Sequence, residues 1–247
     1  MAMAKATDTP TSVWEAPIPG LNITSAIALW LAVTIFIPLY FVETLPNVVA
    51  LAILFFNNLN ILIAFCEIAL GNHIRFIQKD YLQRKKLYRG NEWKAAFEYL
   101  TMPLSLSTLF RGEKWAIMWS TYSLWDPSYQ NQESFGFFID VGNGWSTIPP
   151  CLLWNAAILF PDKVQASWEY AWLLVGVLGC ASYWQVLYGA LIYFLSFFFN
   201  KRHAGRPIAE VVGFVGVANG IWVFFPVFAL YAAVIILRDR DILSAVR

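Results

Sequence analysis

Hydrophobic and polar positions along the chain divide it into long apolar runs separated by polar segments. Each run is longer than the roughly 18 residues that mark a candidate membrane span. The runs cover residues 24–42, 47–71, 136–160, 169–199 and 209–237. This pattern predicts an all-α polytopic membrane protein, a five-transmembrane-helix bundle.

The polar segments around these runs suggest a simple domain organisation. Segment 72–118 is the long one, and in it aromatic residues and leucines alternate with charges. Such alternation is typical of amphipathic helices that lie at a membrane surface. We therefore expect an N-terminal lead at 1–23, a membrane domain at 24–237 that includes 72–118 as an amphipathic loop, and a tail at 238–247.

Composition agrees with a membrane protein. Of 247 residues, 59% are hydrophobic and only 13% are charged, whereas soluble domains carry roughly 25% charged residues. The three cysteines lie inside apolar stretches and form no CxxC pattern, so the sequence predicts no metal site. The basic cluster 84–86 fits attraction to lipid headgroups, and we expect no nucleic-acid partner.

The distribution of positive charge predicts the orientation. With five spans, the N-terminus, 72–134 and 200–208 share one side of the membrane, and they hold thirteen of the 17 Lys and Arg residues. The other four, Lys163, Arg238, Arg240 and Arg247, fall on the opposite side. Positive residues accumulate on the cytoplasmic side. We therefore expect a cytoplasmic N-terminus and a C-terminus across the membrane.

The third run carries an unexpected acid, Asp140. The pair Asp126-Pro127 predicts a helix start, with Asp as the N-cap and Pro at the first helical position. Helical spacing places four residues on one face and Asn143 beside it: Glu133, Asp140, Gly144 and Thr147. A carboxylate in hydrocarbon costs at least about 2.5 kcal/mol, so Asp140 should face the bundle interior with a partner.

The second run supplies that partner, Glu67. The second and third spans are antiparallel, and Glu67 and Asp140 lie at similar depth, with Asn60 on the same face as Glu67. Two carboxyl groups in a dry pocket do not both ionise, which provides one proton donor and one acceptor. An inter-helix hydrogen bond without a functional role is the alternative interpretation.

The last two runs add polar and aromatic residues. The fourth contains Ser182, Gln185, Tyr188, Gly189 and Tyr193. In the fifth, Gly216 and Gly220 form a GxxxG pair that permits close helix contact, within the bundle or in a homodimer. Asn219, Trp222 and Pro226 share one face, and an indole there can stabilise a cation.

These elements resemble the EXPERA family, the emopamil-binding-protein-like membrane proteins that include a sterol Δ8–Δ7 isomerase. One motif of the family reads here as Trp119, Tyr122, Asp126, Tyr129, Asp140 and Pro149, with every interval kept. Two further motifs read as Tyr188-Gly189 with Tyr193-Phe194, and as Asn219, Trp222 and Pro226. The resemblance covers roughly residues 50–235 and implies a five-span fold and an endoplasmic-reticulum location.

The sequence departs from the isomerase pattern at two positions. The third-span acid is Asp140 instead of Glu, and Ile63 stands where the isomerase has a His one turn before its second-span Glu. Glu98 keeps the family's spacing to Trp119, but its surroundings are too polar for a span, so we identify Glu67 as the second acid.

Together the residues predict a membrane-embedded isomerase or cyclase that acts on a sterol or polycyclic terpenoid through a carbocation. Asp140 and Glu67 would be catalytic, in an intramembrane pocket and without a metal or redox cofactor. The expected substrate-binding residues are Trp222, Asn219, Asn143, Tyr188, Gln185, Tyr122 and Trp119. A non-catalytic sterol- or amphiphile-binding protein is the alternative, and a transporter or a structural subunit of a membrane complex is a weaker one.

Overall fold

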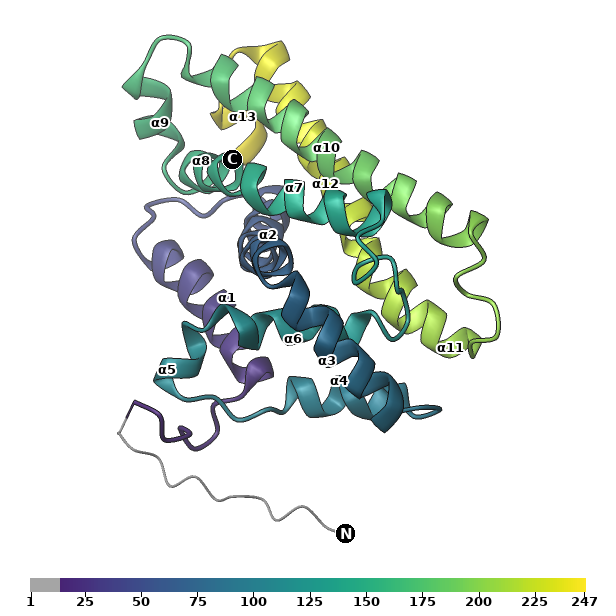
Figure 1. Cartoon of the computed structure of the whole chain (residues 1–247). Helices are drawn as coiled ribbons and strands as arrows, with labels where there is room; N and C mark the ends of the chain where they lie inside the picture. The colour runs from purple at the N-terminus through teal and green to yellow at the C-terminus, as the bar shows by residue number, and fades with distance from the viewer. Residues whose placement is uncertain (1–13) are drawn as a thin grey trace.

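The computed structural model describes residues 14–247, so the first thirteen residues of the predicted lead lie outside the described part. The described chain is helical and contains no β-strand (Figure 1). Four helical segments are long and apolar enough to cross a membrane: α1 (Ile23–Tyr40), α2 (Val48–Asn72), α10 (Ala171–Phe199) and the continuous run Ile208–Asp239. The last run consists of α11 (Ile208–Glu210), the π-helix η2 (Val211–Val217) and α12 (Ala218–Asp239). The all-α prediction is confirmed, and the four apolar segments are consistent with a membrane protein.

The third predicted span is not one long helix. It is divided into the π-helix η1 (Ser134–Phe138), α7 (Ile139–Ser146) and α8 (Ile148–Leu159), and α7 and α8 point in different directions (Figure 1). Pro149 and Pro150 stand at the start of α8. Because proline has no backbone N–H, two helical hydrogen bonds back to α7 cannot form, which explains the break at Thr147.

The predicted helix start at Asp126-Pro127 is wrong. Residues 127–132 form turns, and the Asp126 side chain accepts a hydrogen bond from the Ser128 backbone N–H at 3.0 Å. Gly136 then has φ of 143°, a backbone conformation that L-residues rarely adopt. A Cβ at Gly136 would also collide with Ser128 Oγ, so this glycine sets where the regular helix begins.

Segment 72–118 folds into short helices against one end of the bundle. They are α3 (Ile74–Leu87), α4 (Glu92–Leu100), α5 (Leu106–Leu109) and α6 (Gly112–Tyr122). In Figure 1 this group lies below the long helices, and α6 contacts both α2 and α3. The remaining short helices are α9 (Pro161–Ser167) and α13 (Leu243–Val246).

Helix α2 is the centre of the molecule. It contacts α1, α6, α7, α8 and α12, while α10 and α12 pack along each other (Figure 1). Its N-cap is Asn47, whose side chain accepts from the Ala50 N–H. Helix α1 is different, because Ile23 is its only buried residue and its other apolar side chains are exposed or partly exposed. Exposed hydrocarbon on this scale suits lipid contact and not water.

Candidate active site

The site begins where α7 crosses α2. Gly144 packs so tightly on α2 that an added Cβ would lie 2.8 Å from Glu67 Cβ and 2.9 Å from the Ala64 carbonyl oxygen. Nearer the start of α7, Val141 approaches Gly71 in the same way. The order of these contacts makes the two helices antiparallel, and both Asp140 and Glu67 face the space beside the crossing.

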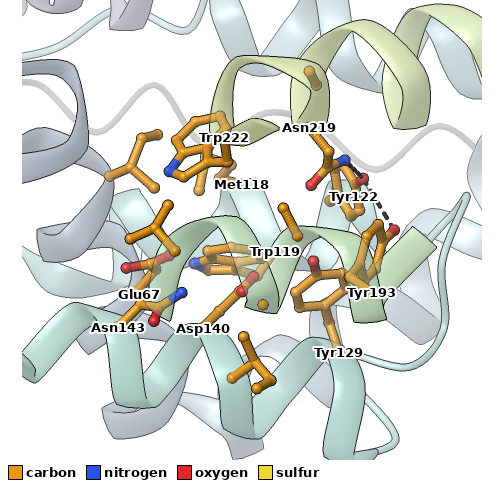
Figure 2. A pocket seen from close by; sticks show the side chains of 16 residues that line it. Glu67, Met118, Trp119, Tyr122, Tyr129, Asp140, Asn143, Tyr193, Asn219 and Trp222 are labelled. Carbon is orange, nitrogen blue, oxygen red and sulfur yellow. Dashed lines mark hydrogen bonds between the residues drawn. The ribbon is translucent and has the colours of Figure 1, made fainter. Parts of the chain in front are cut away.

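A cavity of about 160 Å³ opens beside this crossing, and both acids line it (Figure 2). A cavity needs only about 10–15 Å³ on this scale to hold one water molecule, so this one admits a ligand of many atoms. Seven of the nine predicted site residues line it: Glu67, Trp119, Tyr122, Asp140, Asn143, Asn219 and Trp222. The structure thus brings together α2, α6, α7 and α12 around one space.

The two acids are in different environments. Glu67 is only 4% exposed, and its Oε2 atom has no hydrogen-bond partner among residues 14–247. Asp140 is partly buried, and its carboxyl interacts with the phenol of Tyr129. A buried polar atom without a partner is costly, so Glu67 Oε2 is well suited to meet a guest molecule or to carry a proton.

Both tryptophans of the site are anchored to α2. Trp222 donates its indole N–H to Asn60 Oδ1 at 2.9 Å, and Trp119 donates to the Cys66 carbonyl oxygen at 2.6 Å. These bonds fix how far each indole reaches into the cavity. Asn60, predicted to share the face of Glu67, therefore positions Trp222.

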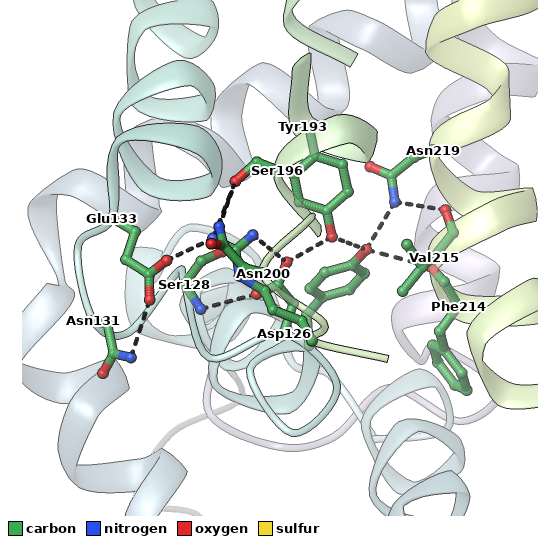
Figure 3. Close-up of polar contacts among 12 residues, drawn as sticks. Asp126, Ser128, Asn131, Glu133, Tyr193, Ser196, Asn200, Phe214, Val215 and Asn219 are labelled. Atoms are coloured by element: carbon green, nitrogen blue, oxygen red, sulfur yellow. Dashed lines mark hydrogen bonds and ion pairs between the residues drawn. The ribbon is translucent and has the colours of Figure 1, made fainter. Parts of the chain in front are cut away.

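A chain of hydrogen bonds leads away from the cavity (Figure 3). The Asn219 amide donates to the Tyr122 hydroxyl at 2.7 Å, and the Tyr193 hydroxyl donates to Asp126 Oδ2 at 2.8 Å. The two hydroxyls are 3.3 Å apart. The Tyr122 hydroxyl also lies 3.4 Å from the Phe214 carbonyl oxygen, to which it can donate. The Tyr193 hydroxyl joins this chain to one buried carboxylate, Asp126.

That carboxylate is held by an ion pair. Arg202 Nη1 lies 3.6 Å from Asp126 Oδ2, and its Nη2 donates to Glu133 at 2.5 Å. The Arg202 side chain is 9% exposed and Asp126 is fully buried. Glu133, expected on the face of Asp140, instead forms this pair away from the cavity. The network ties the 126–133 turns and the loop after α10 to the cavity wall.

Two predicted site residues lie outside the cavity. Tyr188 is 48% exposed and stacks on Trp184 on the outer side of α10. Gln185 donates to Asn143 Oδ1 at 2.9 Å and to Ser146 at 2.7 Å. It therefore reaches the site only through Asn143.

Other residues that face the cavity were not predicted. From α10 they are Val186, Gly189, Ala190 and Tyr193, and from elsewhere Ile63, Met118, Tyr129, Ile139 and Ala218. The spacing of three and four along α10 identifies its cavity face once one member is known. Glu98 lies elsewhere, since its side chain is 47% exposed and near Lys94.

Comparison of the chain with protein-family models, curated proteins and solved structures gives no match. The resemblance to the EXPERA family therefore stays a prediction from the sequence motifs.

Proposed function

We propose that the chain is a membrane-embedded isomerase or cyclase of a sterol or polycyclic terpenoid. One observation carries the proposal: two carboxyl side chains, Glu67 and Asp140, line one cavity whose wall is otherwise mainly aromatic and aliphatic, with two amides. General acid–base catalysis in a water-poor site needs one proton donor and one acceptor. A buried acid pair that shares a proton provides both.

The proposed reaction balances without a redox partner. The protonated carboxyl of the pair donates its proton to one carbon of an alkene, which leaves a carbocation on the other carbon. The second carboxylate then removes a proton from a carbon next to the cation, and the electrons of that C–H bond form the new double bond. The second carboxyl then releases its proton to water and the first takes one up from water, which restores the starting state.

The aromatic wall suits the cationic intermediate. Trp222 and Trp119 line the cavity at fixed positions, and an aromatic face attracts a nearby cation. The amides of Asn143 and Asn219 also line it, and their carbonyl oxygens can face a positive centre.

In this proposal the bundle crosses the membrane five times. The third crossing along the chain, which adds to the four continuous ones, is made by α7 and α8 together. Helix α8 alone has 12 residues and spans only about 18 Å at 1.5 Å per residue. The N-terminus is then cytoplasmic by the charge distribution, and the EXPERA resemblance suggests the endoplasmic reticulum.

Solvent deuterium tests the proposal. Membranes containing the protein are incubated in deuterated water with a panel of sterols and polycyclic terpenes, and products are analysed by mass spectrometry. We expect a double-bond isomer or cyclised product with deuterium at carbon. Asp140→Asn and Glu67→Gln should each abolish incorporation, whereas Glu98→Gln, outside the cavity, should not. No incorporation from any member of the panel would contradict the enzyme proposal.

The second candidate function is a non-catalytic receptor for sterols or cationic amphiphiles. The position of Ile63 favours it, because this residue lines the cavity where the sterol isomerases carry a histidine. An asparagine still hydrogen-bonds, so Asp140→Asn should keep sterol binding in this case. Retained binding together with no deuterium incorporation by the unaltered protein would select the receptor.

A further inference from the structure

A second cavity adjoins the acid pair. It has a volume of about 270 Å³, larger than the first, and its wall comes from α1, α2, α4, α6 and the α12 run. The wall is almost entirely hydrocarbon and aromatic surface, with Leu62, Ala96, Leu100, Trp115 and Phe214 among its members. We name this cavity the apolar chamber and the cavity with Glu67 and Asp140 the acid chamber.

The two chambers share part of their wall. Four residues line both of them: Ile63, Met118, Tyr122 and Ala218. Met118 is unbranched and has three rotatable side-chain bonds, so it changes shape more readily than its branched or aromatic neighbours. Met118 is therefore the member of the shared wall whose rotation most readily connects the two chambers.

An empty apolar chamber of this size is unfavourable. Its lining atoms lose packing contacts, and an engineered apolar cavity of about 150 Å³ in another protein stays dry and takes up benzene. The apolar chamber is larger than that, and it offers water few hydrogen-bond partners. A hydrocarbon group is the occupant that fits.

From the wall that the two chambers share we infer that they form one elongated site. Its ligand is a lipid-like molecule whose polar or cationic centre lies between Glu67 and Asp140 and whose hydrocarbon remainder fills the apolar chamber as far as α4. Only the placement of the polar or cationic centre between the two acids rests on the proposed function. It makes α4, through Ala96, Tyr99 and Leu100, a determinant of which substrates fit.

Photolabelling tests the inference. The probe is an N,N-dimethylalkylamine with a diazirine at the end of a dodecyl chain, added to the full-length protein in lipid nanodiscs. Its ammonium group is attracted to the acid pair, and the diazirine then labels the residues next to the far end of the dodecyl chain. We expect labelled peptides from α4 and α6, mapped by mass spectrometry, and no labelling of α4 by the hexyl homologue.

Two matched substitutions test where the hydrocarbon chain of the probe lies. Ala96→Phe fills the apolar chamber and should abolish α4 labelling by the dodecyl probe, while the hexyl probe still binds, which shows that the variant is folded. Ala181→Phe makes the same change at an exposed position of α10 and should leave α4 labelling intact. Equal labelling of α4 in Ala96→Phe and in the unaltered protein would overturn the inference.

A neutral probe separates this inference from the proposed function. Dodecanol with the same diazirine lacks the charge that the acids attract, and it should also label α4 if the apolar chamber takes up hydrocarbon chains. Labelling by dodecanol without deuterium incorporation would retain the elongated site and reject catalysis. Deuterium incorporation without α4 labelling by either dodecyl probe would do the reverse.

Discussion

At the scale of single residues, Gly144 decides whether the two acids can meet. It packs against α2, where Glu67 Cβ and the Ala64 carbonyl oxygen would lie within 3 Å of an added Cβ. Backbone atoms on the α2 side cannot move as a flexible side chain would. The smallest residue is therefore required one turn after Asp140.

Gly144→Ala should push α7 away from α2 and disturb the acid pair. We expect a loss of about 1–3 kcal/mol of stability, the usual cost of overpacking, together with loss of any deuterium incorporation or amphiphile binding. The control is Gly142→Ala on the same helix, where an added Cβ meets nothing within 4 Å. Since alanine favours helix over glycine by about 1 kcal/mol, the control should be neutral or slightly stabilising. Thermal melts in one detergent compare the two, and equal melting temperatures would contradict the packing argument.

Tyr193→Phe removes the hydroxyl that donates the last bond of the hydrogen-bond chain leading to Asp126. Asp126 Oδ2 then loses a bond of 2.8 Å but keeps its ion pair with Arg202. A hydrogen bond to a charged group contributes roughly 1.5–3 kcal/mol. Tyr188→Phe, on the exposed side of the same helix, should cost little. The measurement is the shift in melting temperature at roughly 2–4 °C per kcal/mol for a chain of this size, and a larger loss in the Tyr188 variant would contradict the assignment.

At the scale of helices, buried amides join α2 to its neighbours. Asn57 donates to Asn155 Oδ1 at 3.0 Å, Asn155 donates to Asn58 Oδ1 at 3.2 Å, and the Tyr183 hydroxyl donates to Asn57 at 3.0 Å. In apolar surroundings such bonds hold helices together where hydrophobic burial gives little preference. The network links α2, α8 and α10 on the side away from the cavity.

Asn155→Ala should leave the Asn57 amide and Asn58 Oδ1 without partners. We expect a loss of about 1–3 kcal/mol with the cavity residues unchanged, so that the melting temperature falls while deuterium incorporation or ligand affinity measured at low temperature is retained. Leu152→Ala on the exposed side of the same helix serves as the matched control. An effect of Asn155→Ala on binding alone, without a change in melting temperature, would show that the network acts on the site and not on the bundle.

Most of the long helices could be predicted from the sequence, but only part of the candidate site could. Long apolar runs identified α1, α2, α10 and the Ile208–Asp239 segment, because length and composition suffice for a span. The break at Thr147 was signalled by Pro149-Pro150, but helical spacing alone treated 136–160 as continuous. The family motif suggested Tyr188 for the cavity, but a motif match cannot tell which side of α10 faces α7. Residues brought in from distant turns, such as Arg202 beside Asp126, have no local signature.

At the scale of the whole molecule, the number of crossings sets the relation between the two ends. Four candidate spans are continuous, and an even number would place both termini on one side of the membrane. If α7 and α8 cross as a bent pair, the number is five and the termini lie on opposite sides. The acid pair then lies at the start of a crossing element, within reach of ligands that dissolve in the bilayer.

Single-cysteine labelling distinguishes these arrangements. The three native cysteines are replaced first, and a single cysteine is then introduced either at Lys86, near the end of α3, or at Ser244 in α13. Each variant is labelled with a membrane-impermeant maleimide in sealed vesicles, once right-side-out and once inverted. Both positions are exposed to solvent on the protein. Five crossings predict opposite labelling, with Lys86 on the same side as an N-terminal tag. The basic cluster at 84–86 should lie in the cytoplasm, because its charge opposes translocation. Labelling of both cysteines from one side would instead mean that α7 and α8 enter and leave the membrane on the same face, and it would require the acid pair to be reached from that face.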